Sequence, residues 1–530
     1  MAIGNNNHRG FSGGYIGYTF APTFLIDLVM FKIFNGIHLV ESYHEWKKQR
    51  RDDKLLSRII KLFIAVAVLI LLWCLPPHVY GIDGLTVVQH RVIAIFGFAI
   101  LMWVFEAIPA WTTSMAVVGL LLFATSDSSF WFFEKGLSAT DLATQVSYKE
   151  ILHCFADPII MLFIGGFILA IAATKSGLDV TLARVLLKPF GKQSKFVLLG
   201  FIMVTAVFSM FLSNTATAAM MLTFLGPVLK ALPADGKGKT ALALAIPISA
   251  NVGGMGTPIG TPPNAIALKY MSEIGIEIGF GQWMAFMIPL TLVLLLLAWV
   301  MLLKLFPFKA KSIELNIEGE LKKDWRSIVV YVTFACTVLL WVLDKKTGVN
   351  ANVVAMLPVG VCAIIGVLTK RDLEEISWSV LWMVAGGFAL GVGLQETGLA
   401  QTLINAIPFG SWPAVVMVVG SGLICYAMAN FISHTATASL LVPILAAVGA
   451  SAAVSANLAP LGGVSTLLIG VAIGSSLGMV LPISTPPNAI AAATGMIEQK
   501  EMIKTGVIMG VLGLVLGYGM LIVLGSTGLI

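Results

Sequence analysis

SNTAT at residues 213–217 and SHTAT at residues 433–437 are two copies of one polar motif, each in the middle of a long apolar stretch. A buried hydroxyl or amide group that lacks a hydrogen-bond partner costs several kcal/mol in hydrocarbon. We therefore expect something to bind at each motif, and we expect the rest of the chain to be organised around these two places.

Each polar motif is followed by a second duplicated stretch, GTPIGTPPNAIA at residues 256–267 and LPISTPPNAIA at residues 481–491. Two adjacent prolines do not fit inside an unbroken helix, because each proline lacks an N–H donor and clashes with the preceding turn. Both proline pairs lie in apolar runs that are long enough to cross a membrane. We therefore expect each of these spans to break near its middle.

The chain has 530 residues, of which 58% are hydrophobic and only 11% are charged, so too few charged side chains remain to cover a water-soluble surface. This composition predicts an all-α polytopic membrane protein. The excess of Lys and Arg, 33 against 27 acidic residues, fits cytoplasmic loops better than binding to an anionic partner such as nucleic acid. Five cysteines are scattered along apolar segments, which indicates packing rather than disulfides or a metal site.

An amino-terminal extension, residues 1–58, precedes the first predicted span. Its apolar run at 15–40 contains Asp27, Lys32 and His38, which favours a helix lying in the membrane interface, with an additional span as the alternative. No basic region leads into a short apolar core, so we expect no cleavable signal peptide. A cluster of basic residues follows and predicts a cytoplasmic segment; binding of acidic lipid or protein is the less favoured interpretation.

Eleven apolar segments have roughly the 20 residues that a transmembrane helix needs. Two further stretches, 195–231 and 412–447, are long enough for two half-crossings and carry the polar motifs at their centres, so we predict re-entrant hairpins there. An ordinary span or span pair is the alternative, because re-entrant backbone is tolerated only where protein or a wet cavity surrounds it. The predicted spans are 59–75, 85–105, 110–124, 159–183, 240–265, 282–304, 328–343, 350–368, 378–396, 465–491 and 505–527.

The distribution of positive charge predicts the orientation of the chain. If the basic residues of 47–61 are cytoplasmic, most other basic loops also fall inside, whereas segments 397–411 and 447–464 contain no Lys or Arg. We therefore expect a multi-pass protein of the cell membrane, with its amino terminus in the cytoplasm and its carboxyl terminus outside.

The chain also contains an internal duplication. GGF at residues 165–167 recurs at 386–388, at nearly the same separation as the two polar motifs and the two TPPN stretches. Five predicted spans lie between equivalent points, and an odd number of crossings reverses the orientation. The sequence therefore predicts an inverted repeat, in which broken helices of both repeats meet at a substrate site near the bilayer midplane. The predicted parts after the extension are a first repeat, 59–310, a cytoplasmic linker, 311–327, and a second repeat, 328–530.

Hairpin tips and broken spans expose backbone groups that bind ions. N–H groups at half-helix N-termini suit an anion, whereas unwound carbonyls and helix C-termini suit a cation. The alternative is that the polar side chains only join the hairpins through hydrogen bonds; two copies, each paired with a broken span, favour a ligand site. The predicted substrate-binding residues are Ser213, Asn214, Thr215, Ser433, His434, Thr435, Thr261, Pro262, Pro263, Thr485, Pro486 and Pro487.

Signatures of enzymes are lacking from the sequence. It contains no HExxH, no GxSxG, no P-loop and no nucleotide-binding domain. We therefore expect a carrier that is driven by the gradient of an ion or of a counter-solute. An anion channel is a remote alternative, because two re-entrant tips that meet at the midplane suit an occluded site better than a continuous pore.

The paired SNT-type motifs, the TPPN breaks and the inverted repeat together resemble the divalent anion:sodium symporter family of dicarboxylate, citrate and sulfate carriers, over residues 59–530. The resemblance implies a homodimer in which a scaffold part stays fixed while a transport part, carrying both hairpins, slides like an elevator. It implies a di- or tricarboxylate substrate such as succinate, malate, 2-oxoglutarate or citrate, and Na⁺ in place of any organic cofactor.

The resemblance also implies roles for individual residues. Asn214 and Thr215 would hold one carboxylate of the substrate, and Thr435 with residue 434 would hold the other. The implied first sodium site consists of Ser209, Ser213, Asn214 and a backbone oxygen near Gly256.

His434 departs from the pattern of the family, whose symporters carry Asn in both motifs. By pseudo-symmetry, Ser209 and Asn214 correspond to Ala429 and His434, so the second cation site has lost a hydroxyl and an amide oxygen. Sodium prefers hard oxygen ligands. In one interpretation a protonated His434 replaces the second sodium ion and the protein exchanges dicarboxylates; in the other, one sodium ion or proton stays coupled and the protein is a symporter. A third interpretation is that His434 only hydrogen-bonds the hairpin.

Overall fold

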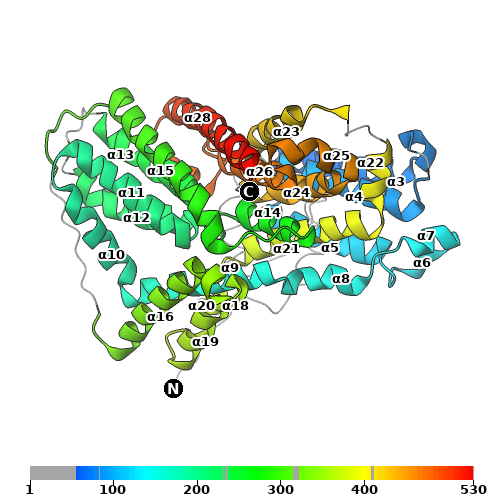
Figure 1. Cartoon of the computed structure of the whole chain (residues 1–530), viewed down its shortest axis with the longest axis horizontal. Coiled ribbons are helices and arrows are strands. Elements are labelled where there is room, and N and C mark those ends of the chain that lie inside the picture. Colours follow the sequence, from blue (N-terminus) through cyan, green and yellow to red (C-terminus); the bar gives the residue numbers. More distant parts are fainter. Residues whose placement is uncertain are drawn as a thin grey trace, which may run out of the picture. The chain divides into compact units, whose positions relative to one another are not determined.

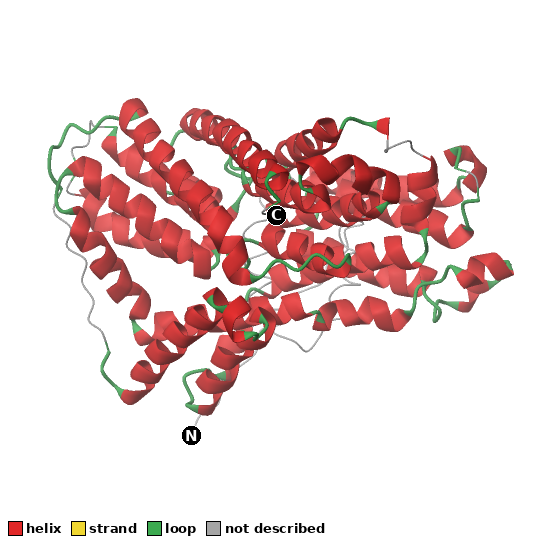
Figure 2. Ribbon diagram, viewed as in Figure 1, coloured by secondary structure: helices red, strands yellow, loops and turns green. Residues whose placement is uncertain are grey.

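The computed structural model describes residues 55–82, 84–230, 232, 237–313, 322–406 and 411–528. These residues form helices that are joined by turns and loops (Figure 1, Figure 2), and no β-strand occurs among them. The chain divides into two compact units, 1–60 and 61–530, and the second contains nearly all of the described residues. The all-helical prediction is therefore confirmed for the described part. The predicted interfacial helix at 15–40 and the basic cluster after it lie outside the described residues.

The elements up to Leu305 follow a definite order. After α3 (Leu55–Cys74) come two helices, a helix with a Gly-Gly step, a helix pair joined by a polar turn, two helix segments separated by a break, and one long helix. The main elements are α4 (Val87–Phe105), α5 (Ala110–Thr125), α9 (Pro158–Ser176), α11 (Ser194–Phe211), α12 (Asn214–Lys230), α13 (Gly238–Gly254), α14 (Pro262–Glu273) and α15 (Phe280–Leu305). The short connecting helices are α6 (Trp131–Glu134), α7 (Ala139–Ala143), α8 (Tyr148–His153) and α10 (Leu178–Leu187).

The same order recurs between Trp325 and Ser526. The main elements are α16 (Trp325–Val342), α18 (Ala351–Val354), α19 (Met356–Ile364), α21 (Trp378–Glu396), α23 (Ala414–Ala429), α24 (His434–Ala450), α26 (Gly463–Ser476), α27 (Pro486–Ala493) and α28 (Gln499–Ser526). The short connecting helices are α17 (Asp344–Thr347), α20 (Lys370–Glu374), α22 (Leu399–Ala406) and α25 (Ala452–Leu458).

Eight helices in the described part of the chain are long and apolar enough to cross a membrane, and α24 with the segment after it makes a ninth candidate that is bent by 94°. The predicted number of eleven spans is not confirmed. The predicted spans 240–265 and 465–491 each consist of two shorter helices, because the proline pair starts a new helix after a break. Two other predicted spans, at 110–124 and 350–368, form shorter apolar helices.

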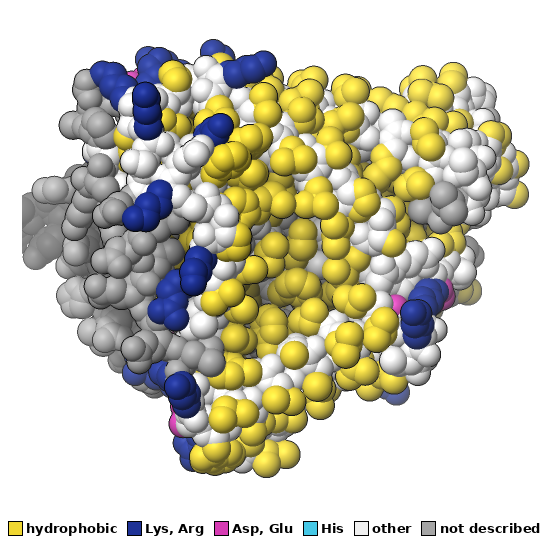
Figure 3. Space-filling view, turned by 60° about the vertical axis from the view of Figure 1, so that its left-hand side comes forward, with side chains coloured by type: hydrophobic (Ala, Val, Ile, Leu, Met, Phe, Trp, Pro, Cys, Tyr) yellow, Lys and Arg dark blue, Asp and Glu magenta, His cyan; other side chains and the backbone are white. Residues whose placement is uncertain are grey.

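The exterior of the described chain suits a lipid environment. Only 6% of the apolar window of α3 is buried, so its Leu, Ile and Val side chains are free to contact lipid. Figure 3 shows a broad apolar surface on one face, with Lys and Arg side chains gathered toward its edges. Charged side chains at the edges of an apolar band are typical of a protein that is embedded in a bilayer.

The helices up to Leu305 form a first run, and those between Trp325 and Ser526 form a second run. The two runs pack into each other rather than side by side as separate bundles. Helix α21 contacts α5, and α9 contacts α16 and α19. The Gly-Gly steps lie at these contacts: a Cβ on Gly165 would come 2.2 Å from Ala355 O, and a Cβ on Gly386 would come 2.4 Å from Ser114 Cβ. Glycine is needed at both places because the neighbouring helix leaves no room for a side chain. Each Gly-Gly helix therefore packs against a helix of the other run.

Candidate binding site at the polar turns and helix breaks

The first polar motif lies at the turn between α11 and α12, two helices that contact each other. Leu212 and Ser213 form the turn, and Asn214 begins α12. Ser213 Oγ accepts a hydrogen bond from Ala216 N at 3.2 Å, which is the capping interaction typical of a helix N-terminus. The stretch predicted as a re-entrant hairpin, 195–231, therefore consists of two helices with the motif between them; α11 alone is also long and apolar enough to cross a membrane, as the alternative expects.

The second polar motif repeats this arrangement between α23 and α24. Ser433 is the N-cap of α24, and its Oγ accepts a hydrogen bond from Ala436 N at 3.1 Å. His434 and Thr435 form the first turn of α24 and are buried, with 7% and 6% of their surface exposed, whereas Thr215 of the first motif is exposed. The two motifs therefore share a backbone geometry but differ in how deeply they are enclosed.

The two TPPN stretches lie where helices restart after a break. Residues 255–261 separate α13 from α14, and residues 477–485 separate α26 from α27. Thr261 and Thr485 are the N-cap residues. Their proline pairs, Pro262-Pro263 and Pro486-Pro487, occupy the first helical positions, where a missing N–H costs nothing. The predicted breaks are therefore confirmed.

The asparagine of each TPPN stretch ties its new helix to the end of the preceding one. Asn264 Nδ2 donates to the carbonyl oxygens of Gly254, Met255 and Thr257 at 2.8 to 3.2 Å. Asn488 Nδ2 donates to Met479 O at 2.8 Å and to Leu481 O at 3.0 Å. These amides satisfy carbonyl groups that the break leaves without a helical partner. Neither asparagine was predicted from the sequence to have a role, although TPPN is duplicated.

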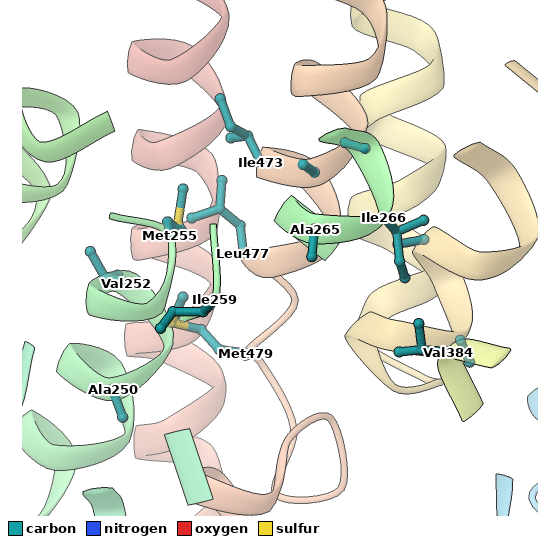
Figure 4. Packing of buried hydrophobic residues seen from close by; sticks show 14 of the residues in the cluster. Ala250, Val252, Met255, Ile259, Ala265, Ile266, Val384, Ile473, Leu477 and Met479 are labelled. Carbon is teal, nitrogen blue, oxygen red and sulfur yellow. The ribbon is translucent and has the colours of Figure 1, made fainter. Parts of the chain in front are cut away.

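The breaks of the two runs contact each other. Asn251 Nδ2, on α13, donates to Thr485 Oγ1 and to Asn488 Oδ1, both at 3.2 Å. Figure 4 shows apolar side chains from both breaks, among them Ile259 and Met479, in one packed cluster. Among the residues that the structure describes, no hydrogen bond runs directly from one polar motif to the other. The two motifs are therefore connected through the breaks.

The Asn214 side chain faces three other oxygen atoms. One end of its amide lies 2.6 Å from Ser209 Oγ, 3.1 Å from Gly260 O and 3.2 Å from Ala250 O. With Nδ2 at that end, the amide donates hydrogen bonds to these oxygens; with Oδ1 at that end, four neutral oxygens converge, which suits a hard cation such as Na⁺. Gly254 makes this approach possible, because a Cβ there would lie 2.6 Å from Asn214 Oδ1.

His434 occupies the corresponding position of the second run. Its Nε2 lies 2.8 Å from Gly478 O, and because a carbonyl oxygen only accepts, this nitrogen carries a hydrogen. Ala429 packs closely against Gly478, so that a Cβ on Gly478 would come 2.5 Å from Ala429 Cβ. The oxygen cluster around Asn214 is therefore replaced by an imidazole and a methyl group.

Gly256 lies in the break after α13 and packs against Met210. Its nearest side chain is Met210, whose Cε lies 2.9 Å from the place of an added Cβ, and Thr257 Oγ1 donates to Met210 O. The carbonyl oxygens that face Asn214 instead belong to Ala250 and Gly260. Sequence reasoning missed these two because a backbone carbonyl leaves no signature in residue identity.

A separate cleft of about 520 Å³ lies among α9, α14, α15 and α18, and none of the predicted binding residues lines it. Charged residues of both signs surround it, including Asp157, Lys269, Glu273, Asp344 and Lys345. Lys269 Nζ lies 3.6 Å from Asp157 Oδ2 and 4.5 Å from the centre of the Phe388 ring. Within the described ranges, no group of three or more His, Cys, Asp or Glu side chains could hold a metal ion.

Comparison with curated proteins identifies relatives along most of the chain. A sodium-dependent dicarboxylate transporter, SdcS, of Staphylococcus saprophyticus is 30% identical over 452 residues, which is 78% of this chain and 82% of the relative. SdcS of Staphylococcus aureus is 30% identical over 442 residues, which is 76% of this chain and 80% of the relative. An uncharacterized transporter of Haemophilus influenzae is 32% identical over 384 residues, which is 68% of this chain and 80% of the relative.

Solved structures share the fold at low sequence identity. The Alcanivorax borkumensis YdaH transporter superposes with a TM-score of 0.51 at 12% identity, covering 82% of this chain and 98% of that one. MtrF of Neisseria gonorrhoeae superposes with a TM-score of 0.50 at 14% identity, covering 78% and 95%.

The sequence model of the sodium:sulfate symporter transmembrane region matches residues 56–527, nearly the whole chain. The chain therefore belongs to the divalent anion:sodium symporter family.

Proposed function

We propose that this protein is a secondary active transporter of di- or tricarboxylates, of the succinate, malate, 2-oxoglutarate or citrate type. The observation that carries the proposal is the pairing of each polar turn with a broken helix. Asn214 faces the carbonyl oxygens of Ala250 and Gly260, and His434 contacts Gly478 O. The SdcS relatives are named as sodium-dependent dicarboxylate transporters, which supports the same substrate class.

The substrate would lie between the two polar turns. The helices α12 and α24 both begin at a motif, and the N–H groups of a first helical turn attract negative charge. Asn214 and Thr215 would hold one carboxylate, and Thr435 with His434 would hold the other. Ser213 and Ser433 cap the two helices, and Thr261 and Thr485 with their proline pairs would close the site from the breaks.

A sodium ion fits the first turn. With its Oδ1 turned toward them, Asn214 would join Ser209 Oγ, Ala250 O and Gly260 O in a neutral oxygen set of the kind that hard cations prefer. When bound, the ion would supply positive charge beside the substrate. Ser213 and Gly256, which the resemblance also implies, would contribute at most from the neighbouring turns.

Two modes of coupling follow from the two turns. Exchange of one dicarboxylate for another is favoured by His434, because its imidazole occupies the place where the second run would need oxygen ligands. Sodium symport is favoured by the oxygen set at Asn214 and by the sodium dependence that the names of the SdcS relatives state. We place exchange first and symport second.

The movement would be of the elevator type. Helices α4, α5, α9, α16, α19 and α21 would form the scaffold part, and both helix pairs with α13, α14, α26 and α27 would form the transport part. At the boundary, glycines of α21 let the two parts approach closely: Gly387 lies against Ser439, and Gly391 lies against Tyr270. One part could slide along this closely packed surface. The protein would work as a homodimer in the cell membrane, with its amino terminus inside and its carboxyl terminus outside.

Transport into liposomes tests the proposal. Vesicles that carry the purified protein are loaded with unlabelled succinate or with buffer alone, and uptake of labelled succinate, malate, 2-oxoglutarate and citrate is measured with and without a sodium gradient. Uptake that requires internal substrate and ignores sodium supports exchange; uptake into buffer-loaded vesicles that requires the gradient supports symport. If none of the four anions is taken up under either condition, the proposal is wrong.

A further inference from the structure

Asn251 forms a buried polar contact between the two runs of helices. It is only 1% exposed, and its Nδ2 donates to Thr485 Oγ1 and Asn488 Oδ1, both at 3.2 Å. The orientation of Asn488 is set independently, because its Nδ2 donates to two carbonyl oxygens and its Oδ1 therefore faces Asn251. Asn251 must then present its nitrogen, and both of its amide hydrogens are used.

This contact determines which hydrogen bonds the Thr485 hydroxyl can still form. Thr485 Oγ1 accepts from Asn251 Nδ2 at 3.2 Å and from Asn488 N at 3.3 Å. A hydroxyl group has two lone pairs and one hydrogen. With both lone pairs engaged, its remaining hydrogen-bonding capacity is the O–H donor, and among the described residues no acceptor for that hydrogen is recorded.

The first run lacks the equivalent contact. Thr261 corresponds to Thr485, and its side chain makes no capping hydrogen bond to α14. In the second run, Ser475 corresponds to Asn251, because both residues lie equally far before the asparagine of their TPPN stretch. The side chain of Ser475 is shorter. Within the described ranges, no hydrogen bond joins Ser475 to Thr261 or Asn264. The arrangement around Thr485 is therefore particular to one side of the site.

We propose that Asn251 is a positioning residue that fixes the Thr485 hydroxyl as a hydrogen-bond donor to one carboxylate of the transported anion. The inference rests on the proposed function and adds a residue of the first run to the half of the site built by the second. A carboxylate accepts hydrogen bonds but donates none when ionised, so a hydroxyl that is held as a donor matches it. Removing the amide would free the hydroxyl to rotate and to accept instead.

Transport kinetics of the full-length protein in liposomes test this inference, with the dicarboxylate that wild type carries best as the probe. For Asn251→Ala we expect the KM to rise about tenfold, as for the loss of a hydrogen bond to a charged group, while Vmax per folded protein changes less than twofold. Thr485→Val should raise the KM equally, and Thr485→Ser, which keeps the hydroxyl, should recover most of that loss. The double variant Asn251→Ala/Thr485→Val should be no worse than Thr485→Val alone.

Ser475→Ala is the matched control, because it shortens the symmetry-related side chain without removing a contact to the first break; its KM should stay within about twofold of wild type. A KM for Asn251→Ala equal to that of wild type, or additive effects in the double variant, would overturn the inference. If Asn251→Ala does not fold, the Thr485→Val and Thr485→Ser pair decides: equal KM values for the two exclude the hydroxyl as a donor. Wild type that carries none of the dicarboxylates would instead contradict the proposed function.

Discussion

The imidazole of His434 donates from Nε2 to the carbonyl oxygen of Gly478, 2.8 Å away. In the first run of helices, the corresponding carboxamide of Asn214 faces a hydroxyl and two carbonyl oxygens. One fold therefore presents an oxygen cluster on one side and a ring nitrogen on the other. This difference is the structural basis for asking whether the second turn binds a cation.

Restoring the oxygen ligands should restore a cation site. We expect the double variant Ala429→Ser/His434→Asn to gain sodium-stimulated uptake of at least about fivefold, because it reproduces the side chains of the first turn, Ser209 and Asn214. The single variant His434→Asn should change the dependence of uptake on pH or on sodium. The measurement is labelled succinate uptake in sodium or choline buffer from pH 5.5 to 8. Unchanged profiles for both variants would exclude a charge or cation role for the imidazole.

Sodium should stabilise the protein against unfolding by binding at the first polar turn, beside Ser209 and Asn214. A ligand at 100 times its Kd raises the free energy of unfolding by about 2.7 kcal/mol. Sodium should therefore raise the melting temperature of wild type in detergent but have little effect on Ser209→Ala or Asn214→Ala. Ser421→Ala is the control, since its Oγ bonds only Val418 O within its own helix, and it should keep the full sodium effect. An equal sodium response in Asn214→Ala would show that the ion binds elsewhere.

The ion pair between Lys269 on α14 and Asp157 at the start of α9 should hold one state of the transport cycle. Its atoms lie 3.6 Å apart, and it would join the moving part to the scaffold. The double variant Lys269→Gln/Asp157→Asn should raise turnover about threefold or more without changing the KM, because it removes the link between the two parts. Glu273, which also pairs with Lys269, is exposed and keeps its contact with solvent. Asn keeps the cap at Ile159 N that Asp157 provides.

The matched control for this pair lies inside the scaffold. Lys175 Nζ on α9 lies 2.6 Å from Asp372 Oδ2 on α20. Since α20 contacts α9, we count it with the scaffold, and these atoms would not separate during transport. Lys175→Gln/Asp372→Asn should change thermal stability but leave turnover unchanged. Equal effects of the two double variants on turnover would show that the ion pair between Lys269 and Asp157 does not hold one state of the transport cycle.

Gly387 should be intolerant of any side chain. A Cβ at this position would lie 2.3 Å from Ser439 Cβ, between α21 and α24. Gly387→Ala should therefore lower transport at least about tenfold or destabilise the protein by about 1–3 kcal/mol. Ser439→Gly in the same chain should recover much of the loss, because it removes the clashing atoms. Gly420→Ala, with nothing within 4 Å, should be neutral or stabilising by up to about 1 kcal/mol.

Local chemistry made parts of the fold predictable. Proline fits the first turn of a helix but not its interior, so the breaks at Pro262-Pro263 and Pro486-Pro487 could be placed from the sequence. Apolar length was a weaker guide, since the predicted span 240–265 consists of two shorter helices and the predicted number of eleven spans is not confirmed. The carbonyl oxygens of Ala250 and Gly260 could not be found, because backbone groups carry no residue signature until the chain is folded around Asn214.

The sequence by itself determined that the chain is helical, where its helices break, that its motifs are duplicated, and which family it resembles. These properties follow from side-chain hydropathy and proline geometry, which act over a few neighbouring residues. Only the tertiary structure decided which elements meet: Asn251 with Thr485 across the two runs, Gly165 with Ala355, and His434 with Gly478. Such contacts join residues far apart in the chain, and they depend on how whole helices pack rather than on any local preference.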